Sequence, residues 1–76
     1  MNKARRRALS DIKEKLDELK EMLENYQAEE EDYLENMPEN LQNGHNGEAA
    51  EEAIDKLESA ALALEEAMDY IEEAII

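Results

Sequence analysis

Apolar residues recur along most of the chain at alternating steps of three and four, which is the spacing of a coiled-coil helix. The first such run lies within residues 3–36. The second lies within residues 48–76, where blocks of seven repeat from Glu51 as EEAIDKL, ESAALAL, EEAMDYI and the shortened EEAII. A sustained heptad repeat favours left-handed packing of one helix on another. The pattern therefore predicts two long helices over these two ranges.

The heptad positions a and d define the side on which each predicted helix faces the other. In the first helix these positions are held by Leu9, Ile12, Leu16, Leu19, Leu23, Tyr26, Glu30, Tyr33 and Met37. In the second helix they are held by Ala50, Ile54, Leu57, Ala61, Leu64, Met68, Ile71 and Ile75. We expect this seam to hold the core of an all-α fold, an antiparallel two-helix coiled-coil hairpin that forms a single domain of residues 1–76.

One antiparallel register satisfies several independent constraints at once. It places Leu23 opposite Leu64 and the bulky Tyr26 opposite a small residue, Ala61, as close packing requires. At position e, which faces e in antiparallel pairs, it brings two lysines opposite two glutamates. These pairs are Lys13 with Glu72 and Lys20 with Glu65. Exposed pairs are worth at most about 1 kcal/mol each, so they specify register more than stability.

Residues 37–47 form the predicted connection, because they hold the only proline and both glycines. Pro38 lacks a backbone N–H and disfavours helix in the residue before it, so the first helix is expected to end just before this point. Pro38 also suits the start of a short helical turn that folds Leu41 back as a lid. Two dipeptides that permit positive φ predict turns, namely Asn43-Gly44 and Asn46-Gly47.

Apolar residues outside the seam predict a further interface, because a hairpin this small buries only one stripe on each helix. The second helix carries alanine at every position g and further apolar residues beyond the seam. The candidate dimer-interface residues are Ala53, Ala60, Leu62, Ala67, Tyr70 and Ala74. The economical assembly is a homodimer that forms a four-helix bundle. The alternative is that this face binds another protein.

Composition and charge exclude several classes of protein. The 76 residues contain no cysteine, and 22 acidic against 8 basic residues give a net charge of −14. Direct binding to nucleic acid is not expected, since affinity for phosphate comes mainly from lysine and arginine. No apolar run is long enough to span a membrane, and no secretory apolar region follows the basic start. We expect a protein that stays inside the cell and does not bind membranes.

Candidate catalytic groups are few. His45 is the only histidine, and no nucleophile or metal-binding partner lies at motif spacing from it, so a role in a turn is favoured. Glu30 occupies an a position opposite Leu57. It is either a buried carboxylate ligand or an exposed side chain where the seam frays. The Glu-x-x-His pair of di-iron bundles is absent from the sequence. We expect no enzymatic activity, no cofactor and no metal site.

Carboxylates cover one side of the second helix. Residues 48–76 contain ten acidic residues, or one per roughly 4 Å of helix, against about 3.4 Å for the phosphates of one DNA strand. The candidate partner-binding residues lie at positions e and f: Glu51, Glu52, Glu58, Glu65, Glu66, Glu72 and Glu73. They either occupy the basic, nucleic-acid-binding groove of another protein or only keep the helix surface solvated.

The opposite charge collects at the start of the chain. Residues 1–20 carry a net charge of +3, whereas residues 21–76 carry −17. The four cations nearest the start are Lys3, Arg5, Arg6 and Arg7. They either bind phosphate or an acidic partner, or neutralise the acidic end of the second helix through Glu72 and Glu73. The helix dipole argues mildly against cations at a helix N-terminus.

Three stretches resemble the small acidic helical-hairpin proteins of phages and prophages of Gram-positive bacteria. They are the start MNKARRRALSDIKEKLDELKEMLE, the central NMPENLQNG and the Glu/Ala-rich last helix. The most specific part is Met37-Pro38-Glu39-Asn40-Leu41-Gln42. That group has no established activity, so the resemblance implies the cytoplasm of a bacterial host as the context but no site residues.

Two functional hypotheses follow. In the first, the protein is a non-enzymatic, phage-type inhibitor whose acidic helical surface engages a basic host or defence protein. In the second, it is a structural or adaptor module, a homodimeric helical bundle whose apolar face holds a partner helix. Salt discriminates between them, because electrostatic binding weakens as salt rises and helix packing does not.

Overall fold

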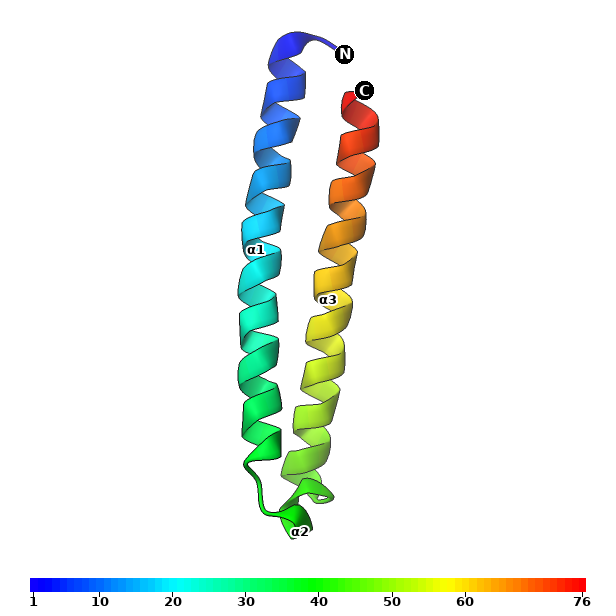
Figure 1. Ribbon diagram of the computed structural model, residues 1–76. Helices are drawn as coiled ribbons and strands as arrows, with labels where there is room; N and C mark the ends of the chain where they lie inside the picture. The colour runs from blue at the N-terminus through cyan, green and yellow to red at the C-terminus, as the bar shows by residue number, and fades with distance from the viewer.

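The computed structural model describes all 76 residues and contains three helices. They are α1 (Lys3–Glu35), α2 (Glu39–Gln42) and α3 (His45–Ile75). The long helices α1 and α3 pack antiparallel as an extended hairpin, with α2 at the end opposite both termini (Figure 1). The predicted all-α hairpin is confirmed. None of its helices contains a stretch long and apolar enough to cross a membrane.

Local hydrogen bonds define both ends of α1. At its start, Asn2 Oδ1 accepts a hydrogen bond from the backbone N–H of Arg5 at 2.7 Å, and such a cap stabilises a helix by about 1 kcal/mol. At its end, Asn36 Nδ2 donates to the backbone carbonyl of Asp32 at 2.8 Å. Pro38 follows shortly after and cannot continue the helix, so the predicted end of the first helix is confirmed.

The connection is shorter and more helical than predicted. Pro38 caps α2, and its carbonyl accepts hydrogen bonds from the backbone N–H groups of Leu41 and Gln42. The predicted helical turn is therefore confirmed, but Leu41 is 53% exposed and does not act as a lid. The helix α3 begins at His45, three residues before the predicted start. It can begin there because Gly44 adopts an extended conformation with φ −87°, so no turn with positive φ intervenes.

Gly47 has a different role from the turn residue that the sequence suggested. It is buried in the first turn of α3, beside α2. A Cβ atom at this position would overlap the backbone carbonyl of Gln42. Glycine is therefore needed here for a close approach of two backbones rather than for a positive φ.

The observed register of the two long helices is the predicted one. The ammonium group of Lys13 lies 3.1 Å from a carboxylate oxygen of Glu72. The ammonium group of Lys20 lies 3.8 Å from a carboxylate oxygen of Glu65. Both pairs join position e of α1 to position e of α3, so these lysines and glutamates close one flank of the seam. We call this side of the hairpin the acidic flank.

The seam itself differs from the prediction in half of its α1 positions. The half-buried residues of α1 follow positions a and e rather than a and d: Leu9, Lys13, Leu16, Lys20, Leu23, Gln27, Glu30 and Leu34. Tyr26, expected to pack into the seam on Ala61, is 59% exposed, although Ala61 itself is only 5% exposed. Most of the Tyr26 side chain therefore lies in solvent rather than in the seam, unlike its predicted position.

The rotation of α1 has a physical explanation. Two helices packed on each other can bury only a narrow stripe of side chains on each helix. The positions on one side of the a row must therefore remain outside the seam. Lys13 and Lys20 lay their methylene stems along the seam while their ammonium groups reach Glu72 and Glu65. This arrangement turns position e toward α3 and position d toward solvent.

The hairpin has a thin core. Only Gly47, Ala50, Ala61 and Met68 are fully buried. The Cα trace extends over 59 × 14 × 12 Å with a radius of gyration of 17.3 Å, whereas a compact domain of this length has about 11 Å. A single core in a chain this small rarely supplies more than about 3–5 kcal/mol. The isolated hairpin therefore leaves much of its apolar surface in water.

Candidate interaction surfaces

The side chains that α1 turns away from the seam form an exposed apolar stripe. Ile12, Leu19, Tyr26 and Tyr33 are each between 45% and 59% exposed. They are seven residues apart, so they follow one line along the helix. Met22, also exposed, lies beside this line because it is three residues after Leu19 and four before Tyr26. A row of large apolar side chains in water is unusual for a surface of otherwise charged helices.

The alanines of α3 continue this surface across the hairpin. Ala53 and Ala67 are half-buried, and Ala60 and Ala74 are exposed. Tyr26 of α1 and Ala53 of α3 line the same surface hollow, so the two rows are adjacent. We call the combined surface the apolar face; it consists of Ile12, Leu19, Met22, Tyr26, Tyr33, Ala53, Ala60, Ala67 and Ala74. It lies on the side of the seam opposite the acidic flank.

The two other residues predicted for a dimer interface lie on different sides of α3. Tyr70 is three residues after Ala67, so it borders the apolar face. Leu62 is two residues from Ala60, which places it about 200° around the helix. It therefore lies on the acidic flank, beside Glu58. The structure brings the four alanines and Tyr70 together and separates Leu62 from them.

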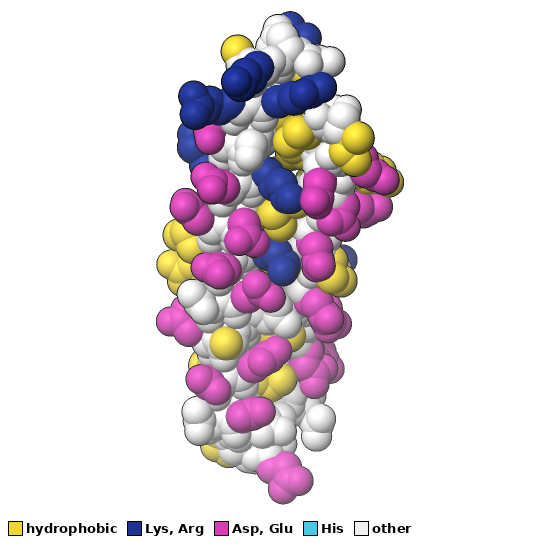
Figure 2. Space-filling model, turned by 45° about the horizontal axis from the view of Figure 1, so that its top comes forward, with side chains coloured by type: hydrophobic (Ala, Val, Ile, Leu, Met, Phe, Trp, Pro, Cys, Tyr) yellow, Lys and Arg dark blue, Asp and Glu magenta, His cyan; other side chains and the backbone are white.

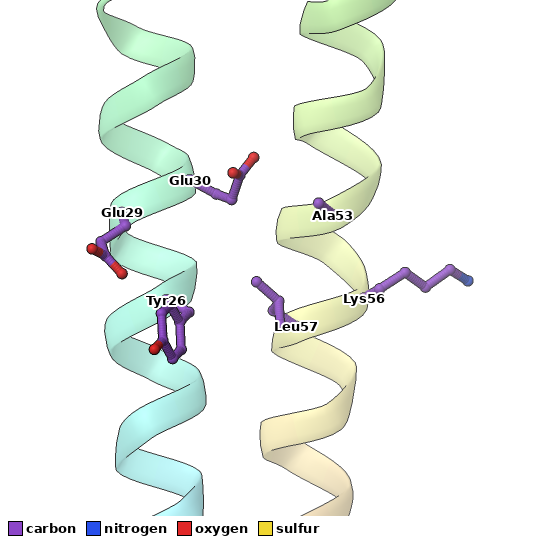
Figure 3. Close-up of a pocket in the computed structure, with 6 residues that line it drawn as sticks. All are labelled: Tyr26, Glu29, Glu30, Ala53, Lys56 and Leu57. Carbon is purple, nitrogen blue, oxygen red and sulfur yellow. The ribbon is translucent and has the colours of Figure 1, made fainter.

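Charged groups on the apolar face are restricted to its edges. Lys15 and Glu29 lie along the outer edge of α1, at helical spacing from the stripe residues, and Lys56 lies along the outer edge of α3. Glu29 and Lys56 line the same hollow, yet their side chains extend outward in opposite directions (Figure 3). Within one hairpin they do not form an ion pair.

Glu30 projects into the gap between α1 and α3, near Leu57 (Figure 3). Its side chain is half-buried, so Glu30 is neither the buried carboxylate nor the exposed side chain that its a position suggested. It makes no ion pair, because Lys56 in the same hollow extends away from it. Nowhere in the chain do three histidine, aspartate or glutamate side chains converge in a group that could hold a metal ion.

The acidic residues predicted to bind a partner all project into solvent. Each of the seven is exposed: Glu51, Glu52, Glu58, Glu65, Glu66, Glu72 and Glu73. Only Glu65 and Glu72 are engaged in ion pairs, and both bind a lysine of α1. In Figure 2, acidic side chains spread over most of the visible surface, and most basic side chains gather at the end that holds the termini. The carboxylates are therefore accessible to a basic partner.

The remaining candidate residues lie at the two ends of the hairpin. The basic residues Lys3 and Arg5–Arg7 are exposed and form no ion pair, so they do not neutralise the end of α3 as one interpretation expected. Glu72 binds Lys13 instead. His45 is the exposed first residue of α3 rather than a turn residue, and it lines a hollow with Tyr33.

The heptad pattern does not predict the exposed stripe on α1, because these residues hold position d and position d normally faces the seam. A signal was present in the two tyrosines. A tyrosine hydroxyl needs a polar partner when buried, so Tyr26 and Tyr33 suit an edge that water can reach.

The phage resemblance stays a prediction. No protein-family model, no curated protein and no solved structure matches this chain.

Proposed function

We propose that the protein is a non-catalytic, helix-packing module that joins other helices through its apolar face and so completes a four-helix bundle. One observation carries the proposal. The residues at position d of α1, which belong to the core in a heptad helix, are about half exposed in the isolated hairpin. A second pair of helices laid on this face would convert all four stripe residues into core residues.

The magnitude of the effect supports this proposal. Fully burying a large apolar side chain contributes about 1.5–3 kcal/mol, so burying the exposed halves of four such side chains contributes about 3–6 kcal/mol. This equals or exceeds the roughly 3–5 kcal/mol expected from the core of a small hairpin alone. Association therefore matters as much to this fold as its own internal packing.

A second candidate function uses the other side of the hairpin. The exposed carboxylates of α3 lie on or beside the acidic flank, away from the apolar face. Their spacing of roughly 4 Å along the helix approaches that of the phosphates in a nucleic-acid strand. An acidic competitor of this kind, such as an inhibitor of a nucleic-acid-binding host or defence protein, would bind a basic groove with an on-rate that falls as salt rises.

One experiment separates the two candidates by altering each surface alone. The apolar variant is Leu19→Gln with Tyr26→Gln, at half-exposed positions. The acidic variant is Glu58→Gln with Glu66→Gln and Glu73→Gln, which spares both ion-paired glutamates. Glutamine is a good helix former, so both variants should keep the helicity of the parent in circular dichroism. Each is used to capture partners from cells and is analysed for mass in solution.

Loss of all association by the apolar variant, with the acidic variant unchanged, supports the helix-packing module. If the acidic variant alone loses a basic partner, and that binding weakens steeply between low and physiological salt, the acidic competitor is supported instead. A helix-packing module is contradicted if the apolar variant keeps both the assembly mass and every partner of the parent protein.

A further inference from the structure

We propose that the apolar face is occupied by a second copy of this chain. The two copies are related by a two-fold axis parallel to the hairpin, so that α1 of each copy packs on α3 of the other. Both connections then lie at the same end of the bundle. This inference rests on the proposed function, for which it names the partner and the geometry.

Side-chain size is the first argument for this arrangement. The ion pairs establish the register of the hairpin, and in that register each large stripe residue lies level with one alanine of α3. These level pairs are Ile12 with Ala74, Leu19 with Ala67, Tyr26 with Ala60 and Tyr33 with Ala53. A two-fold axis along the hairpin places each large side chain on the matching alanine of the second copy. Large residues facing small ones give the even spacing that close packing requires.

Charge on the edges of the apolar face is the second argument. Glu29 and Lys56 lie at the same level, since they line one hollow, but they extend from opposite outer edges (Figure 3). The two-fold axis lays the outer edge of α1 over the outer edge of α3 in the second copy. Each Glu29 therefore meets the Lys56 of the second copy, and the pair forms twice. By the same operation Lys15 comes level with Tyr70 of the second copy, where a cation–π contact is favourable.

The area of the face is sufficient for a stable dimer. A length of 59 Å and a width of roughly 20 Å for two helices give about 1,200 Å² on each copy. The total of about 2,400 Å² exceeds the range of about 1,200–2,000 Å² for standard specific interfaces and falls among the larger interfaces of obligate homodimers. The two acidic flanks face outward, roughly 20 Å apart. Their repulsion is largely screened, because the Debye length in physiological salt is about 8 Å.

The opposite orientation, with the two connections at opposite ends, packs less evenly. It lays α1 on α1 and α3 on α3, so large residues meet large ones along one side and alanines meet alanines along the other. The two helix pairs then require different spacings, which opens a wedge in the bundle. Its only advantage is that it moves the two acidic connection ends farther apart and so reduces their repulsion. Salt screens this repulsion in either orientation.

The first test compares two leucines of similar exposure. Leu19 on the apolar face is 49% exposed and Leu62 on the acidic flank is 57% exposed. Light scattering and sedimentation should return a dimer mass for the parent protein and for Leu62→Gln. Leu19→Gln should weaken dimerisation by at least about tenfold, because it removes two buried leucines from the dimer.

The second test reads the orientation directly. The chain has no cysteine, so single cysteines can be introduced without competing thiols. Leu19→Cys and Ala67→Cys chains, co-expressed with different tags, should form a mixed disulfide, while neither forms one alone. A disulfide requires Cα atoms within about 7 Å, a distance that only directly packed helices reach. Met22→Cys should not cross-link to itself, because the two α1 helices lie on a diagonal of the bundle.

The third test addresses the charge pair. Glu29→Lys should weaken dimerisation by roughly tenfold, since it sets two lysines against each other at two places. Combining it with Lys56→Glu restores the opposite charges across the interface and should recover the affinity of the parent. Failure of the double variant to recover would contradict the predicted contact.

The outcomes separate this inference from the proposed function. A monomer mass for the parent protein at high micromolar concentration overturns the second copy as the occupant, and the helix-packing module still stands if Leu19→Gln abolishes capture of a different protein. Self-cross-linking of Met22→Cys overturns the orientation. A dimer that Leu62→Gln dissociates and Leu19→Gln does not would overturn both proposals.

Discussion

The two sides of the seam are built on the same repeat but behave differently. On the acidic flank, Lys13 and Lys20 reach across to glutamates of α3 and cover the seam. On the apolar face, the large residues of α1 stand beside alanines too short to cover them. One side of the hairpin is closed by its own side chains, and the other is open and suited to further helices.

The difference lies in the length and polarity of the facing side chains. A lysine spans the gap with an apolar stem and a charged end that remains in water, so it suits the margin of a two-helix seam. Alanine has no such reach, but it permits the close approach of another helix. Residues at the margin of the seam therefore decide which side of the hairpin leaves apolar side chains exposed.

The largest expected effect comes from blocking the open side. Ala60→Arg places a long cation in the middle of the apolar face, where overpacking costs about 1–3 kcal/mol and an unpaired buried charge costs more. We expect loss of assembly with helicity kept, measured by light scattering and circular dichroism. The control is Ser59→Arg, one position away and outside the apolar face. Equal loss of assembly in both variants would contradict the distinction between the two sides.

A smaller effect is expected at the connection, where α2 lies against the start of α3. In Gly47→Ala, the new Cβ overlaps the backbone carbonyl of Gln42, so α2 must move away from α3. We expect a loss of about 1–3 kcal/mol in the free energy of unfolding, measured in urea at a fixed protein concentration. Gly44→Ala is the control, because its Cβ would lie 3.3 Å from the nearest atom, the carbonyl oxygen of Leu41. A larger loss for Gly44→Ala would contradict this account of the close approach.

The smallest effect is expected from the ion pairs of the acidic flank. A double-mutant cycle of Lys20→Met and Glu65→Gln should give a coupling energy below about 1 kcal/mol, and high salt should reduce it further. Lys20→Met alone should be nearly neutral, because methionine keeps the apolar stem that covers the seam. A coupling of several kcal/mol would mean that charge, rather than the lysine stem, closes this flank.

Much of the fold follows from local sequence. The heptad spacing predicts both long helices, Pro38 predicts the end of the first, and the lysines and glutamates at position e predict the register that the structure shows. The start of α3 at His45 and the role of Gly47 could not be read from the chain. Asn-Gly dipeptides suit turns and helix starts alike, and only the approach of α2 decides between them.

By itself, the sequence determined which residues align along each helix, since that depends only on a period of about 3.5 residues. It did not determine how far α1 rotates about its own axis, because positions d and e flank the a row symmetrically. The tertiary structure settled that rotation, and with it the exposure of Ile12, Leu19, Tyr26 and Tyr33. The physical reason is that the choice depends on contacts with α3, where lysine stems and ion pairs compete with apolar packing across residues far apart in the chain.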